Sequence, residues 1–95
     1  MIRALQAGDL LAVEAIARRA FGVERAAPSL GSPHALALFD PGRAAYAHGV
    51  VIAGEAELHE IAVEPGRRRA GAGRALLAAF VAAAAARGAS VVHLE

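Results

Sequence analysis

The chain has 95 residues, the length of one domain, and its ten Lys and Arg nearly balance nine Asp and Glu, for a formal net charge of +1. So small a charge excludes a general attraction to nucleic acid or anionic membranes, and any basic cluster must act locally. The absence of cysteine excludes disulfides and thiolate metal ligands. The N-terminus lacks the apolar region of a secretion signal. We therefore expect one cytoplasmic domain, residues 1–95, without a membrane span.

The first part of the chain predicts a strand and a helix. Residues 1–6 favour a short strand. Asp9 is placed to cap a helix over residues 10–21, where apolar side chains recur every three or four positions. Gly22 is expected to end this helix. Residues 23–33 contain several Gly, Ser and Pro and predict a loop.

The middle of the chain predicts antiparallel strands. Apolar runs over residues 34–39 and 44–53 flank an Asp-Pro-Gly turn and are expected to pair as a hairpin. A second turn at Gly54 leads into a strand over residues 56–64. Strand alternation predicts that four side chains of this strand share one face: Glu57, His59, Ile61 and Val63.

After Pro65 the apolar residues recur at helical spacing until Gly88, which is expected to end the second helix. Residues 90–94 then predict a strand parallel to residues 56–64. The apolar face of the helix is expected to carry Leu76, Leu77, Phe80, Val81 and Ala84. This order of elements predicts an α+β fold with a mixed, mostly antiparallel sheet flanked by helices.

The segment EPGRRRAGAGRALLAAF, residues 64–80, would leave a strand and open a helix. Such a loop presents unpaired backbone N–H groups at the positive end of the helix dipole, and Gly71 and Gly73 would let an anion approach without a Cβ in the way. The segment lacks the third glycine of the dinucleotide fingerprint and the Gly-Lys-Ser/Thr of a Walker loop. It therefore predicts a phosphate-binding loop of another kind, or a solvated turn formed by the arginines at 67–69.

The residues IAVEPGRRRAGAGRALL resemble the acetyl-CoA signature of the GNAT superfamily of N-acetyltransferases, whose core is Arg or Gln, two residues, Gly, any residue, then Gly or Ala. The resemblance extends to MIRALQAGDLLAVEAIARRAF, which is similar to the family's first strand and helix, and to GEAELHEIAV, which is similar to its fourth strand. It implies a three-layer α/β GNAT-like fold and a transferase that uses acetyl-CoA as cosubstrate.

The same resemblance implies which residues contact the cofactor. The strand end Ile61, Ala62 and Val63 would pair with the pantetheine arm, and the Val63 N–H would polarise the thioester carbonyl. Backbone amides of the loop would hold the pyrophosphate. The loop residues implied are Arg68, Arg69, Ala70, Gly71, Ala72, Gly73 and Arg74.

Among subfamilies, the chain most resembles the ribosomal-protein alanine N-acetyltransferases, which share an EAEL-like strand, a helix ending in Arg-Gly and a strand ending in Leu-Glu. This resemblance implies Glu95 as general base and a protein N-terminal amine as acceptor. Members of the family continue with a cofactor-contacting Asn, a helix bearing a Tyr general acid, and two further strands. We expect this chain to lack that final helix and those strands and to act alone slowly or not at all. An exposed C-terminal strand would then invite a homodimer.

Two other candidates for the base lie on the strand over residues 56–64. Glu57 matches the catalytic glutamate of histone-type members, and His59 resembles the catalytic histidine of arylalkylamine N-acetyltransferases, which would make the acceptor a small amine. A base is needed because the acceptor amine is mostly protonated at neutral pH. The alternatives are a half-buried structural His59 and solvated carboxylates at Glu57 and Glu60. Tyr46 is interpreted as packing.

Two other kinds of site are not expected. The remaining histidines show no metal-ligand spacing, so no metal site is predicted. The arginine run lacks the interleaved aromatic residues that stack on bases, so nucleic acid is not an expected partner. Besides the two transferase functions, a CoA-binding but catalytically incomplete fragment remains as an alternative.

Overall fold

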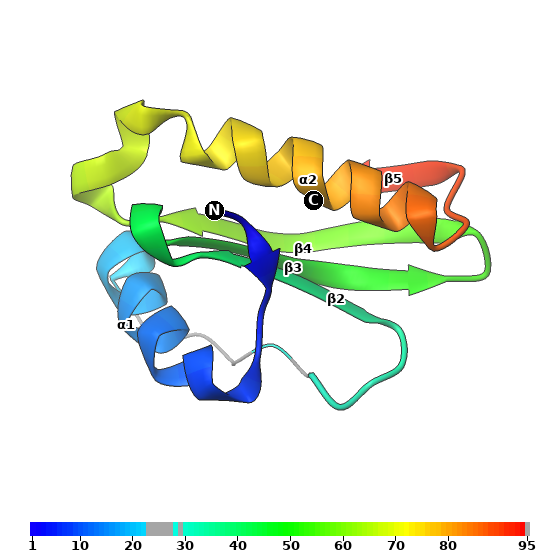
Figure 1. Cartoon of the computed structure of the whole chain (residues 1–95), viewed down its shortest axis with the longest axis horizontal. Helices are drawn as coiled ribbons and strands as arrows, with labels where there is room; N and C mark the ends of the chain where they lie inside the picture. Colours follow the sequence, from blue (N-terminus) through cyan, green and yellow to red (C-terminus); the bar gives the residue numbers. More distant parts are fainter. Residues whose placement is uncertain (23–27, 29, 95) are drawn as a thin grey trace.

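The computed structural model describes residues 1–22, 28 and 30–94, with only the backbone of residues 68–70 (Figure 1). Its centre is a five-stranded sheet in the order β1-β2-β3-β4-β5. The strands are β1 (Arg3–Ala4), β2 (Ala35–Asp40), β3 (Ala45–Ile52), β4 (Glu55–Val63) and β5 (Val91–Leu94). The helices are α1 (Leu10–Phe21) and α2 (Ala72–Ala86), and the short 3-10 helices are η1 (Ala7–Asp9), η2 (Pro41–Arg43) and η3 (Pro65–Ala70).

The sheet is mixed, as the sequence predicts. Strands β1 to β4 pair antiparallel with their neighbours, whereas β4 and β5 run parallel, from Glu55 opposite Val91 to Leu58 opposite Leu94. Helix α2 makes the crossover between these two parallel strands. Helices α1 and α2 lie on opposite faces of the sheet (Figure 1). The predicted α+β fold, a mostly antiparallel sheet flanked by helices, is therefore confirmed.

Helix α1 begins and ends as predicted, but Asp9 does not cap it. The Asp9 carboxylate accepts hydrogen bonds from the Gln6 N–H at 2.9 Å and from the Arg3 guanidinium at 2.7 and 2.9 Å. Because Asp9 already has helical dihedrals at the end of η1, its side chain closes the preceding turn. The bond with Arg3 holds the pKa of Asp9 at about 2. Gly22 ends α1 in the left-handed conformation, with φ 75°.

The face of α2 against the sheet is narrower than predicted. Val81, expected on that face, is 42% exposed, because the buried residues recur at every fourth position and Val81 lies one position further round the helix. The buried stripe consists of Ala72, Leu76, Phe80 and Ala84, each 0% exposed. Despite the alanine content of α2, the described residues include no helix with the length and apolar character needed to cross a membrane.

A β-bulge divides β4. His48 lies opposite Glu60 and Gly49 lies opposite Leu58, so the intervening His59 has no direct partner on β3. Before the bulge, Leu58 packs against the core under α2; after it, Ile61 does so as well. The prediction that Glu57, His59, Ile61 and Val63 share one face is therefore wrong. The extra residue reverses the alternation and brings Ile61 and Val63 to the α2 side, opposite Glu57.

We expect Gly49→Ala to be strongly destabilising. A Cβ at Gly49 would lie 1.9 Å from the Glu57 carbonyl oxygen and 2.9 Å from Phe80 Cζ, so β3, β4 or α2 would have to move. Overpacking of this kind costs about 1–3 kcal/mol or more. Urea unfolding measures the loss, and Gly8→Ala is the control because a Cβ there meets nothing within 4 Å. Equal midpoints for the two variants would contradict the predicted clash.

Candidate functional site

An apolar cavity lies where the first turns of α2 face the β4 bulge and the end of β5. Its volume is about 400 Å³, and it is lined by Leu58, Ile61, Gly73, Arg74, Leu77 and Leu94. Three of these residues, Ile61, Gly73 and Arg74, are predicted cofactor contacts. The reversal of alternation at the bulge creates this wall, because without it Ile61 would face away from α2.

The N-terminus of α2 opens beside this cavity. The first backbone bond of the helix runs from the Ala75 N–H to the Gly71 carbonyl at 3.0 Å. Gly71 occupies the capping position and has no side chain to cap the helix. The N–H groups of Ala72, Gly73 and Arg74 precede that bond and point out of the helix end. Their partial positive charges and the helix dipole make this a favourable place for an anion.

The other predicted cofactor residues lie in different environments. The Ala72 methyl group is fully buried in the core, so only its backbone is available to a ligand. Ala62 is buried on the α1 side, and Val63 pairs with Ala45 in the sheet. Val63 also lies under the helix start, because a Cβ at Gly73 would be 3.7 Å from Val63 Cγ2. Residues 68–70 contribute backbone from η3, and their side chains lie outside the described structure.

Gly71 has a conformational role in addition to the predicted approach of an anion. A Cβ there would meet no atom within 4 Å, so crowding does not require glycine. The backbone conformation requires glycine instead. Gly71 has a φ of 77°, and this left-handed conformation, which joins η3 to α2, is costly for residues with a Cβ. Gly71 therefore sets the direction in which the loop enters the helix.

Two of the predicted bases contact each other on the face of β4 opposite α2. The His59 Nε2 and Glu57 Oε1 atoms are 2.8 Å apart, and both side chains are partly exposed, at 36% and 49%. The His59 ring also meets the His48 ring edge-on, with centroids 6.2 Å apart. The third candidate, Glu95, lies outside the described residues.

A buried polar group next to this pair was not predicted. Tyr46 is 1% exposed, which confirms that it packs in the core, but its hydroxyl also donates to the Glu60 carboxylate. Glu60 is only 12% exposed, so the interpretation of it as a solvated charge is wrong. His48 stacks on Tyr46 at 6.1 Å, with its Nε2 buried 3.8 Å from Glu60, too far for a hydrogen bond. Only the bulge brings Glu60 opposite His48, and a bulge has no clear signal in the sequence.

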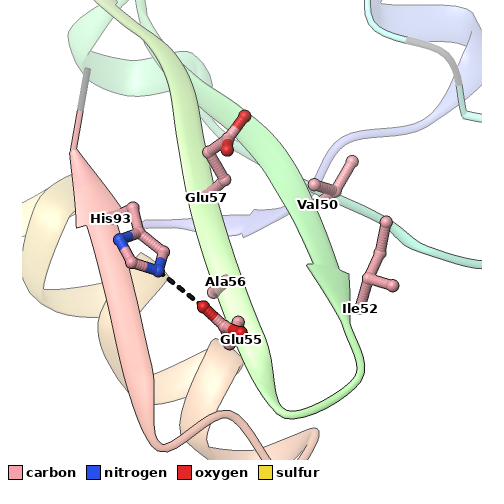
Figure 2. Close-up of a pocket in the computed structure, with 6 residues that line it drawn as sticks. All are labelled: Val50, Ile52, Glu55, Ala56, Glu57 and His93. Atoms are coloured by element: carbon pink, nitrogen blue, oxygen red, sulfur yellow. Dashed lines mark hydrogen bonds and ion pairs between the residues drawn. The ribbon is translucent and has the colours of Figure 1, made fainter.

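Another pocket, of about 370 Å³, lies further along the face of the sheet opposite α2 (Figure 2). Val50 and Ile52 of β3 form its apolar side, and His93 of β5 bonds Glu55 of β4 at 2.7 Å. Glu57 also lines it and points away from the His93–Glu55 pair (Figure 2). Within the described part of the chain, no group of three or more His, Asp or Glu is arranged to hold a metal ion.

Comparison with known proteins gives one family and a set of similar folds. The model of the acetyltransferase (GNAT) family matches residues 13–95. A ribosomal-protein-S18-alanine N-acetyltransferase from Escherichia coli superposes with a TM-score of 0.83 at 32% identity, over 99% of this chain and 64% of that one. The chain thus spans less than two thirds of the length of the E. coli protein. No curated protein sequence matches closely enough to count as a relative.

More distant structures share the fold. An aminoglycoside 6'-N-acetyltransferase from Acinetobacter haemolyticus has a TM-score of 0.79 at 15% identity, over 100% of this chain and 78% of that one. Another aminoglycoside N-acetyltransferase, solved in complex with CoA, has a TM-score of 0.78 at 16% identity, over 100% of this chain and 75% of that one. At these identities the likeness concerns the fold alone.

Burial of His48 is expected to make the protein sensitive to acid. Loss of water around the ring lowers the pKa of His48 below 6.5, although the Glu60 carboxylate opposes this. The unfolded chain then takes up a proton first, so stability falls as the pH drops below about 6.5 and levels off below the folded-state pKa. His48→Gln should flatten this dependence in urea unfolding between pH 5 and pH 8. His34 is exposed, so His34→Gln is the control. An unchanged dependence of stability on pH in His48→Gln would show that His48 is not the source of the acid sensitivity.

Proposed function

This chain belongs to the acetyltransferase (GNAT) family, and we infer from that membership and from the site that it binds acetyl-CoA and acetylates a primary amine. The family predicted from the sequence is thus confirmed. The observation that carries the function is the open N-terminus of α2 beside the apolar cavity. A pyrophosphate suits the helix end, and the pantetheine arm suits an apolar channel.

We assign the pyrophosphate to the backbone amides from Arg68 to Arg74 and the pantetheine arm to the cavity lined by Ile61 and Leu77. The aminoglycoside acetyltransferase solved with CoA supports the choice of cofactor. A cytoplasmic location belongs to the same proposal, because acetyl-CoA is made and used inside cells.

The reaction needs a group that takes a proton from the acceptor. The amine nitrogen forms a bond to the thioester carbon, the C–S bond breaks, and its electron pair leaves with the CoA sulfur. In this proposal Glu57 accepts a hydrogen bond from His59 Nε2–H, which leaves Nδ1 of the same ring free to accept the amine proton. Glu95 is the alternative base, implied by the resemblance to the alanine N-acetyltransferases.

A protein N-terminal amine is the first candidate acceptor, because the solved structure at 32% identity is an enzyme acting on ribosomal protein S18. A small amine is the second, favoured by the contact between His59 and Glu57. The third alternative, a CoA-binding fragment without activity, rests on the 64% coverage of the E. coli protein.

A homodimer through β5 also belongs to this proposal. Strand β5 is at the edge of the sheet, and its Val91 and Leu94 side chains are 46% and 60% exposed. Sedimentation velocity would detect the dimer as a species whose fraction increases with protein concentration. A monomer at every concentration would contradict the proposed dimer.

The cofactor site is tested by Gly71→Val. A β-branched residue is strained at φ 77°, so the loop should change direction and acetyl-CoA should bind about tenfold or more weakly. Calorimetry measures the affinity, and circular dichroism shows that the helices remain. Gly66→Ala is the control in the same loop, since its added Cβ meets nothing within 4 Å. Unchanged affinity in a folded Gly71→Val protein would remove this assignment of the cofactor loop.

The base is tested by His59→Ala and Glu57→Gln. Loss of a general base lowers turnover by about 10²–10⁴, so we expect His59→Ala to fall in this range and Glu57→Gln to lose less. Release of CoA is followed with a peptide carrying an N-terminal alanine and with a small arylalkylamine, and His34→Ala is the control. A silent His59→Ala together with an inactive Glu95→Gln would move the base to Glu95.

A further inference from the structure

We propose that Glu64 and Arg67 are positioning residues that hold the anion-binding loop between β4 and α2 in place. The inference rests on the function proposed above and adds a structural control of CoA affinity to it. Both residues belong to the segment that enters and forms η3, immediately before the Gly71 turn.

Glu64 ties the start of this segment to two distant elements. Its carboxylate oxygen Oε1 lies 2.7 Å from Arg19 Nε in α1, and its backbone N–H donates to the Ala44 carbonyl at 3.0 Å. The carboxylate does not cap η3, although Glu64 occupies the capping position. The side chain therefore serves the contact with α1 and not the local helix.

Arg67 ties the middle of the segment to the turn between β2 and β3. Its Nη1 group donates to the Gly42 carbonyl in η2 at 2.8 Å, and its Nε lies 3.9 Å from Glu64 Oε2. Its backbone N–H donates to the Glu64 carbonyl at 2.8 Å. With its guanidinium engaged in this way, Arg67 is a structural member of the arginine run and not a phosphate ligand.

The segment needs such contacts because a 3-10 helix has weak internal hydrogen bonds. Both ion pairs are partly exposed, with Arg19 and Arg67 at 53% and 55% and Glu64 at 27%, so they contribute little to global stability. Their effect is expected on the position of the loop. A small displacement of the amides at Ala72 and Gly73 is enough to weaken a multidentate anion contact.

A purely electrostatic role for these residues predicts a different result. If only charge mattered, removal of the Glu64 carboxylate would strengthen the binding of an anionic ligand, and removal of the Arg67 guanidinium would weaken it. A positioning role predicts that both changes weaken binding. The sign of the effect at Glu64 therefore separates the two explanations.

The experiment compares Glu64→Gln, Arg67→Met and the double variant by calorimetry with CoA. We expect each single variant to bind CoA about tenfold more weakly, and the double variant to lose little more, because the two residues act as one unit. Binding of pantetheine, which has no phosphate, should not change. Glu14→Gln and Arg87→Met are the controls with matched loss of charge, because neither residue contacts the described part of the loop or η2, and both should bind CoA as the parent does.

Amide hydrogen exchange of residues 65–75 provides a readout that needs no ligand. Exchange there should become faster in both single variants while the urea midpoint stays unchanged. Unchanged exchange, or tighter CoA binding in Glu64→Gln, would overturn the positioning role. If the parent chain bound no CoA, the proposed function would fail instead, and the exchange rates alone would decide whether Glu64 and Arg67 hold the loop.

Discussion

The packing of α2 on the sheet depends on how closely β3, β4 and α2 meet at Gly49. A single added carbon there would lie 1.9 Å from the backbone of β4 and 2.9 Å from the ring of Phe80. Because Gly49 lacks a side chain, Phe80 packs directly onto the sheet, and α2 lies close enough to bury its whole stripe from Ala72 to Ala84. The register of β3 and β4 shifts at the same place, between His48 and Gly49. The close packing of α2 and the register shift between β3 and β4 therefore occur at the same residue.

The bulge gives the two faces of β4 different chemistry. On the α2 side, Ile61 joins an apolar wall that ends at an open helix N-terminus. On the other side, His59 and Glu60 follow one another with imidazole and carboxylate groups that each have a polar neighbour. In the proposed reaction the amine nitrogen and the thioester carbon meet on the first face, and the proton would reach His59 on the second face through water.

Most of the fold could be predicted from the sequence because its signals are local. The spacing of apolar residues and the glycines at 22 and 88 identified both helices, and the Asp-Pro-Gly turn identified the hairpin. The Asp9 cap was wrong because the choice between closing η1 and capping α1 depends on Arg3, six residues away. Val81 was assigned to the core because helical spacing alone does not show how close α2 lies to the sheet.

The candidate site was only partly predictable. The glycine loop was found because a chain that leaves a strand and opens a helix has a sequence signature. The contacts among Tyr46, His48 and Glu60 could not be predicted, because they depend on the shift in register that reverses the alternation of β4. Likewise, nothing in a run of three arginines shows that Arg67 turns towards Gly42, a contact between residues 25 positions apart. Long-range contacts of this kind follow from the fold and not from the local sequence.

The buried position of Tyr46 also determines which part of the molecule tyrosine fluorescence reports on. The chain contains one tyrosine and no tryptophan, so its tyrosine fluorescence comes from this single ring. The ring is fixed between α1 and the bulge, with Glu60 as acceptor and the His48 ring stacked above it. A change in emission on addition of a ligand would therefore report on the face of β4 opposite α2, whereas a ligand confined to the helix end of α2 would be expected to leave the signal unchanged. The protein carries a built-in fluorophore that distinguishes occupation of one face from occupation of the other.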